Sequence, residues 1–195
     1  MKKIITISRE FGAGGSQIGR AVAERLGYYY MDKDVIIRSA VESSSLTPRD
    51  FRIFDEKVPH NFGFGQSLFD FYNKPLDVRL FEAQRVAIRK AAESGNCVIV
   101  GRNANVILKE YDYSLHVFVA ASDYFKLNNL REKMPGVPDD KIRERMRDVD
   151  RTRRKYCSYY THTKFGNAAH YDLCLKSSSL GVDTCVDIIC GIASD

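Results

Sequence analysis

The N-terminal part of the chain joins an apolar segment to a glycine-rich turn. Ile4-Ile5-Thr6-Ile7 has the composition of a buried strand, and Gly12-Ala13-Gly14-Gly15-Ser16-Gln17 follows after a short lead-in. Glycines let the backbone adopt positive φ and approach a ligand closely, so consecutive N–H groups can converge on one anion at the positive end of the next helix. The pattern predicts a strand, a turn that holds phosphate at residues 12–17, and a helix.

The residues that close the turn indicate which phosphate ligand it suits. Ser16 stands where P-loop proteins place the hydroxyl that binds Mg²⁺, but the lysine position of the Walker A motif is Gly15. A tight turn without a ligand is one alternative. An NAD site is another, because Asp32 lies about twenty residues further on, but the third glycine of G-x-G-x-x-G is missing. We therefore favour ATP with Mg²⁺ as the ligand.

Size and composition limit the class of protein. A chain of 195 residues fits one domain, 1–195, and lacks an apolar run of the roughly 18 residues that span a membrane. The apolar start ends at Ser8, so it reads as a first strand and not as a targeting sequence. Five cysteines without a C-x-x-C pair predict free thiols and a cytoplasmic location. A net charge of +5 is modest for a nucleic-acid-binding domain, so we do not expect nucleic acid as a partner.

Strand-like and helix-like patterns alternate along most of the chain. Continuous apolar runs at 97–100 and 115–119 are typical of strands that are covered on both faces. The other expected strands cover 4–7, 28–31 and 171–175, and the expected helices cover 14–26, 34–41, 76–94, 103–109, 123–133, 139–160 and a closing segment from 182 to 192. This order predicts an α/β fold with a parallel sheet and helices on both faces.

The pattern is looser between about 43 and 75. The segment 62–72 is rich in phenylalanine, which is unusual for a disordered linker. We expect a helical insert that packs over a site or a partner subunit, and a homodimer through 62–72 is one form of that prediction.

The basic segment 139–160 carries an apolar stripe with one exception. Helical spacing aligns Arg153 with the apolar side chains of Ile142, Met146, Val149, Tyr156 and Tyr160. An arginine in such a stripe must either reach water along its stem or meet an anion, and Asp150 lies three residues before it. A solvated face of ion pairs is one interpretation. The others are a mobile arm whose arginines close over phosphates, and an RNA-binding helix at 141–160.

Two further arginines lie near the predicted ends of strands. Arg102 follows Gly101 directly after the strand at 97–100, and Arg38 lies in the helix after the second strand. Ligands of open parallel sheets bind beyond the carboxyl ends of the strands, so Arg102 and the glycine turn should share one crevice. Surface salt bridges are the alternative.

With these pieces in place, the chain resembles the cytidylate kinase-like family, a branch of the P-loop nucleoside monophosphate kinases. The similar segments occur in the family's order and cover nearly the whole chain: 4–16 with Ile18-Gly19, then 30–34, 98–105, 150–156 and 171–173. The resemblance implies a P-loop NTPase-type parallel five-stranded sheet with helices on both faces. It also implies a nucleoside-monophosphate-binding region at about 43–75 and a helical lid at about 135–165.

The resemblance also implies roles for individual residues. Residues 12–17 would cradle the phosphates of ATP, with Ser16 on the Mg²⁺ ion. Binding of a nucleoside monophosphate such as CMP or dCMP would fall to four side chains, those of Asp32, Arg38, Arg79 and Arg102. Asp150 and Arg153 would belong to the lid, whose arginine approaches the transferred phosphoryl group.

The chain departs from cytidylate kinases proper at three places. It has Gly15 at the P-loop lysine, Val100 where an Asp precedes the central Gly-Arg, and Lys33-Asp34 where a Ser-Gly pair follows the second strand. For phosphoryl transfer, Arg9 or a lid arginine would have to replace the charge of the lysine. A regulatory protein that binds nucleotide without transferring phosphate is the alternative.

Overall fold

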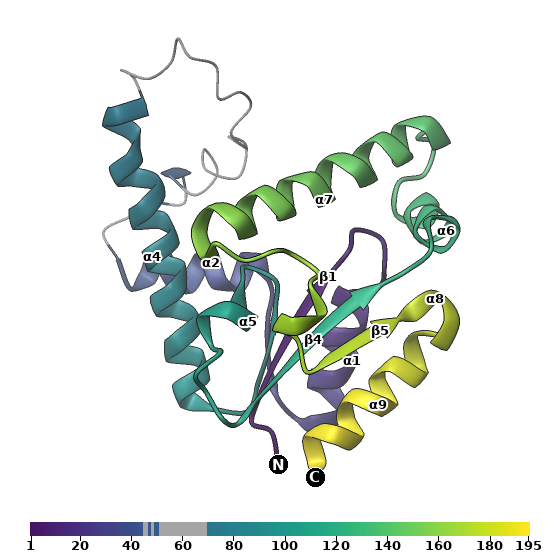
Figure 1. Ribbon diagram of the computed structural model, residues 1–195, viewed down its shortest axis with the longest axis horizontal. Helices are drawn as coiled ribbons and strands as arrows, with labels where there is room; N and C mark the ends of the chain where they lie inside the picture. Colours follow the sequence, from purple (N-terminus) through teal and green to yellow (C-terminus); the bar gives the residue numbers. More distant parts are fainter. Residues whose placement is uncertain (45–46, 48, 51–69) are drawn as a thin grey trace.

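The computed structural model describes residues 1–44, 47, 49, 50 and 70–195 (Figure 1). The strands are β1 (Ile4–Arg9), β2 (Tyr29–Met31), β3 (Cys97–Val100), β4 (Ser114–Ala120) and β5 (Leu173–Lys176). The helices are α1 (Gly15–Leu26), α2 (Lys33–Glu42), α4 (Asp70–Ser94), α5 (Ala104–Ile107), α6 (Asp123–Lys133), α7 (Asp139–Thr161), α8 (Ser177–Leu180) and α9 (Val182–Ser194), with a 3-10 turn at Ala168–His170. None of the helices in these ranges is long and apolar enough to cross a membrane.

The strands form one parallel sheet, as the sequence predicted. Their order is β2-β3-β1-β4-β5, with β1 in the centre. β1 pairs with β3 from Ile4 opposite Cys97 onward, and with β4 from Ile4 opposite Ser114 onward. The carboxyl end of β1, where the glycine turn begins, therefore lies between the carboxyl ends of β3 and β4. Ligands of such sheets bind at this edge.

Helices cover both faces of the sheet, and each face has its own apolar core (Figure 1). Ile5 and Ile7 face α1 and α9, whereas Ile4 faces α4 and α5. Alternate residues of a strand point to opposite faces, so a continuous apolar run is what a doubly covered strand requires. The prediction of helices on both faces is confirmed.

Several boundaries differ from the sequence expectations by a few residues. The long helix begins at Asp70 instead of residue 76, and the expected helix at 103–109 is limited to Ala104–Ile107. β5 begins at Leu173 instead of 171, and just before it the Asp172 carboxylate accepts a hydrogen bond from the His116 N–H (2.7 Å). Gly27 and Gly95 adopt positive φ after α1 and α4, which are the helix stops that the sequence predicted. Most of the aromatic segment 62–72 lies outside the described residues.

Helix α7 lies across the carboxyl edge of the sheet (Figure 1). Near its start, Ile142 and Met146 pack with Leu127 and Leu130 of α6 in a small buried cluster. Near its end, the ring of Tyr160 stacks on Phe81 of α4 with centroids 4.4 Å apart. The two apolar contacts hold the helix over the glycine turn, and the stripe found in the sequence supplies both.

A buried histidine connects β1 and β4 inside the sheet. His116 Nδ1 is 2.8 Å from the Thr6 hydroxyl and Nε2 is 3.0 Å from the Ser114 hydroxyl. Burial lowers the pKa of His116, although the charge of Asp172 opposes the shift. The folded protein therefore keeps this ring neutral at a pH where the unfolded chain takes up a proton.

We expect the free energy of unfolding to fall as the pH drops below about 6.5, the ordinary histidine pKa. Urea unfolding between pH 5 and pH 8 measures this decrease in the free energy of unfolding, and the decrease should be smaller in His116→Gln. His170 is exposed, so His170→Gln is the control and should keep the wild-type dependence. An identical dependence in the His116 variant would show that this ring does not cause it.

Candidate active site

Two of the three glycines in the turn have the positive φ that the sequence predicted, and the third, Gly15, is helical. Gly12 and Gly14 adopt left-handed φ values of 86° and 82°, and α1 begins at Gly15. Ser16 and Gln17 are exposed in the first turn of this helix. The positive end of a helix twelve residues long thus opens onto the carboxyl edge of the sheet, where an anion would be stabilised.

Protein donors hold the turn from outside. Asn129 Nδ2 donates to the Gly12 carbonyl (2.9 Å), and the buried Ser177 hydroxyl donates to the Ala13 carbonyl (2.7 Å). The Phe11 N–H donates to Asp150 Oδ1 (2.8 Å). Carbonyl oxygens repel phosphate, so turning two of them toward protein donors favours an anion on the other side of the turn.

Arg153 meets an anion, which was one of the two outcomes considered for an arginine in an apolar stripe. Its Nη1 donates to the Arg9 carbonyl (2.9 Å) and to Asp150 Oδ1 (3.4 Å). Its guanidinium also lies 5.7 Å from the centroid of the Phe11 ring. Arg153 and Asp150 together tie α7 to the residues that lead into the glycine turn.

Arg9 lies between the charges of two other arginines, Arg153 and Arg102. Burial lowers the pKa of Arg9 to about 9, and the charges of Arg153 and Arg102 act in the same direction. The guanidinium of Arg102 lies 5.7 Å from the centroid of the Tyr156 ring on α7. Like charges in a partly buried crevice destabilise one another, so a polyanion bound among them would be stabilised.

The same surroundings change the pKa of the buried Asp150 carboxylate. Burial raises its pKa, while the Phe11 N–H and the charge of Arg153 lower it. Its charge offsets part of the repulsion among the arginines. Removal of Asp150 would leave both the Phe11 N–H and Arg153 without this acceptor.

The loop after β3 is strained next to the same crevice. Gly101, Arg102 and Asn103 adopt consecutive positive φ values of 85°, 56° and 57°. For residues other than glycine such values cost about 1–3 kcal/mol each, and they occur often at functional sites. Asn103 is buried, and within the described part of the chain its Nδ2 atom has no hydrogen-bond partner. No role for Asn103 was predicted from the sequence, in which it lies beside Arg102 in the segment 98–105.

The remaining candidate residues lie around this centre. Asp32 accepts hydrogen bonds from the Asp34 and Val35 N–H groups as the N-cap of α2, and its carboxylate lies 3.7 Å from Arg20. Arg38 and Arg79 are exposed on α2 and α4. The described contacts therefore bring together Arg9, Arg102, Arg153 and Asp150, but they do not join Arg38 or Arg79 to that group.

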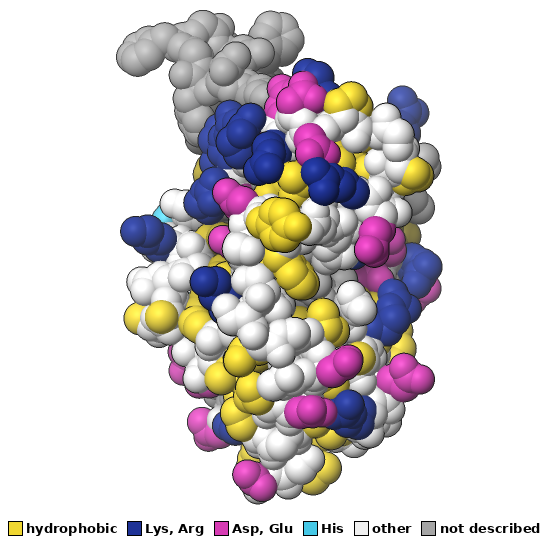
Figure 2. Space-filling model, turned by 90° about the vertical axis from the view of Figure 1, so that its right-hand side faces the viewer, with side chains coloured by type: hydrophobic (Ala, Val, Ile, Leu, Met, Phe, Trp, Pro, Cys, Tyr) yellow, Lys and Arg dark blue, Asp and Glu magenta, His cyan; other side chains and the backbone are white. Residues whose placement is uncertain are grey.

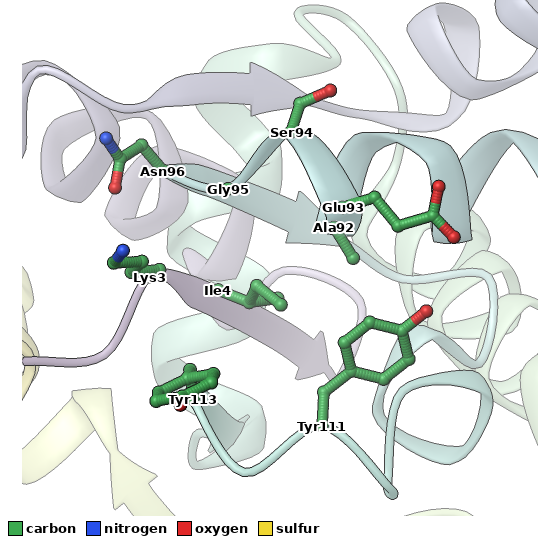
Figure 3. Close-up of a pocket in the computed structure, with 9 residues that line it drawn as sticks. All are labelled: Lys3, Ile4, Ala92, Glu93, Ser94, Gly95, Asn96, Tyr111 and Tyr113. Atoms are coloured by element: carbon green, nitrogen blue, oxygen red, sulfur yellow. The ribbon is translucent and has the colours of Figure 1, made fainter.

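Charged side chains surround a hollow next to the residues that lead into the glycine turn. A hollow of about 210 Å³ beside the turn, between α6 and α7, combines carboxylates such as Glu10 with Lys126 and arginines of α7. Figure 2 shows Lys and Arg side chains gathered toward α6 and α7, with fewer over α8 and α9. A larger hollow of about 360 Å³ lies at the opposite edge of the sheet, where Tyr111, Tyr113 and Lys3 surround the start of β1 (Figure 3). Of the residues that surround the glycine turn, Glu10 and Asp150 line the first hollow, and neither hollow is lined by Arg9, Arg102 or Arg153.

Comparison with known proteins agrees with the resemblance found in the sequence. The cytidylate kinase of Methanococcus vannielii is 24% identical over 188 residues, which are 95% of this chain and 97% of that protein. The cytidylate kinase of Halobacterium salinarum is 24% identical over 186 residues, which are 95% of this chain and 86% of that protein.

Solved structures with the same fold include an uncharacterized protein and a kinase. The uncharacterized protein from Eubacterium ventriosum is 25% identical, with a TM-score of 0.74 and 98% of both chains covered. Shikimate kinase from Bacteroides thetaiotaomicron is 16% identical, with a TM-score of 0.58 and 100% of both chains covered, so the fold is that of the P-loop kinases. The model of the cytidylate kinase-like family matches residues 4–179. The chain belongs to the cytidylate kinase-like family.

Proposed function

We propose that the protein transfers the γ-phosphoryl group of ATP to a nucleoside monophosphate, with CMP or dCMP as the leading acceptors. One observation carries the proposal: the side chain of Arg9 runs from Gly15 of the glycine turn to Gly101 at the end of β3, next to Arg102, and Arg153 donates to the Arg9 carbonyl oxygen. Family membership and relatives named cytidylate kinase support the choice of acceptor.

The residues divide between the two substrates. The main chain at 12–17 holds the ATP phosphates at the start of α1. Arg102, at the end of β3, binds the acceptor phosphate, and we assign Asp32, Arg38 and Arg79 to the acceptor site because the family resemblance implies it. Arg153 and Arg9 face the transferred group, and Asp150 positions Arg153. Helix α7 is the central part of a lid at about 135–165.

The reaction needs little covalent help from the protein. An oxygen of the acceptor phosphate forms a bond to the γ-phosphorus while the bond from that phosphorus to the bridging oxygen of ADP breaks. The products are ADP and a nucleoside diphosphate, and no oxidant or reductant takes part. The transition state spreads charge over three equatorial oxygens, so positioning and positive charge supply most of the catalysis.

Magnesium would be held at Ser16. The described residues contain no group of three His, Cys, Asp or Glu side chains that could form a metal site by themselves. The exposed Ser16 hydroxyl at the start of α1 fits the usual Mg²⁺ site, in which one or two protein ligands combine with phosphate oxygens and water. Bound there, the ion would neutralise charge on the ATP phosphates.

Steady-state assays with Mg·ATP and a panel of nucleoside monophosphates test the proposal. We expect turnover with at least one pyrimidine monophosphate and a kcat in the ordinary kinase range of about 1–100 s⁻¹.

The cytoplasmic location stays a prediction, which fractionation of cells would test.

A nucleotide-binding regulatory protein is the second candidate. The glycine at the lysine position favours it, because Gly15 cannot itself supply the positive charge at the phosphates. Both candidates predict nucleotide binding, and only turnover separates them. Tight binding of ATP without transfer to any monophosphate would favour the regulator.

A further inference from the structure

The side chain of Arg9 lies against the glycine at the lysine position. A Cβ atom added to Gly15 would lie 2.5 Å from Arg9 Cβ and 2.8 Å from Arg9 Cγ. These two atoms begin the arginine side chain, so they cannot move aside as the end of a flexible chain could. Gly15 is not among the residues with positive φ. Space, and not backbone conformation, therefore requires glycine here.

The other end of the arginine lies against a second glycine. A Cβ atom added to Gly101, at the end of β3, would overlap Arg9 Nη1. Arg9 thus runs from the start of the glycine turn, past Gly15, to Gly101. Its guanidinium is placed next to Arg102 and within reach of the charge of Arg153.

At positions 9 and 15, a basic residue and a glycine occur in the opposite order from the P-loop pattern. In the pattern G-x-x-x-x-G-K-[ST], Ser16 aligns with the final hydroxyl residue, so Gly15 aligns with the lysine and Arg9 with the first glycine. The contact between these positions shows why the exchange is reciprocal: a side chain at one leaves no room for a side chain at the other.

We infer that Arg9 is the phosphate-binding cation of this site and takes both the space and the role of the P-loop lysine. This inference rests on the proposed function. Because the guanidinium lies at the end of β3, it is placed between the turn that holds ATP and the arginine that holds the acceptor phosphate. The side chain of a lysine at position 15 would instead extend from the first residue of α1.

Thermal unfolding tests the contact without any nucleotide. Gly15→Ala should lower the Tm by about 5 °C in the wild-type background, which corresponds to about 1–2 kcal/mol in a chain of this size. In the Arg9→Gly background the same change should leave the Tm equal or slightly higher, because Ala is favoured over Gly in a helix. Arg9→Ala is the matched control: it keeps the Cβ atom, so Gly15→Ala should still lower the Tm. If Gly15→Ala changed the Tm equally in all three backgrounds, the side chain of Arg9 would not be what requires glycine at position 15.

Calorimetry with a non-hydrolysable ATP analogue and Mg²⁺ tests whether Arg9 binds phosphate. Arg9→Gly should weaken binding about 100-fold, and Arg9→Gly with Gly15→Lys should recover at least tenfold of the loss. Arg25→Ala, at an exposed arginine of α1, should bind as the wild type does. Unchanged affinity in Arg9→Gly would overturn the inference alone, whereas a wild-type protein that binds no nucleotide would overturn the proposed function as well.

Discussion

Arg153→Ala should lower kcat for phosphoryl transfer about 10³-fold, the effect of an arginine that stabilises the transferring group in P-loop GTPases. Arg153 lies beside the arginine that we assign to the phosphates and donates to its carbonyl oxygen (2.9 Å). Removal of its guanidinium leaves the ATP-holding main chain at 12–17 in place. The affinity for an ATP analogue should therefore change much less than kcat.

The control for this experiment lies on the same helix. Arg151 is exposed and pairs with Asp148 at 2.6 Å, so Arg151→Ala removes an arginine of α7 that does not contact the glycine turn. It should keep kcat within about twofold, since exposed ion pairs contribute little. A kcat for Arg153→Ala within tenfold of the wild type would contradict the role of Arg153 at the transferred group.

Asp150→Ala should lower the free energy of unfolding by about 3 kcal/mol, as expected when one partner of a buried ion pair is removed. Its side chain is 10% exposed and that of Arg153 is 23% exposed. The change also leaves the partly buried Phe11 N–H without its acceptor, which adds to the cost. Urea unfolding measures the difference.

Two variants separate burial from charge in this prediction. Asp150→Asn keeps an oxygen that can accept from the Phe11 N–H, so it should cost clearly less than Asp150→Ala. Asp148→Ala removes a carboxylate whose side chain is 49% exposed, and it should change stability by less than about 0.5 kcal/mol. Equal losses for Asp148→Ala and Asp150→Ala would show that the buried contact adds nothing.

The sequence contained the information for most of the fold. The apolar runs of β3 and β4 are buried on both faces, so their composition was enough to predict a parallel sheet. The stripe on α7 predicted which residues pack, and its one exception, Arg153, contacts Arg9 at the proposed active site. Helix ends were less exact, because capping hydrogen bonds and contacts with neighbouring elements decide the last few residues.

The arrangement of the site could be predicted only in part. Motif order placed the glycine turn and Arg102 at one edge, but the contact between Arg9 and Gly15 depends on the path of a side chain through space. The same holds for Asn103, whose burial comes from the left-handed turn after β3. The pairing of Asp150 with the Phe11 N–H joins residues far apart in the chain, and helical spacing cannot reveal it.

The most direct test of phosphate binding by the glycine turn is an NMR titration of the isotope-labelled protein with a non-hydrolysable ATP analogue and Mg²⁺. Binding of the phosphates should produce the largest backbone amide shifts at residues 12–17, together with a shift of the Arg9 side-chain N–H signal. Amides of 12–17 that stay unchanged at saturating analogue, or shifts confined to another surface, would contradict the account.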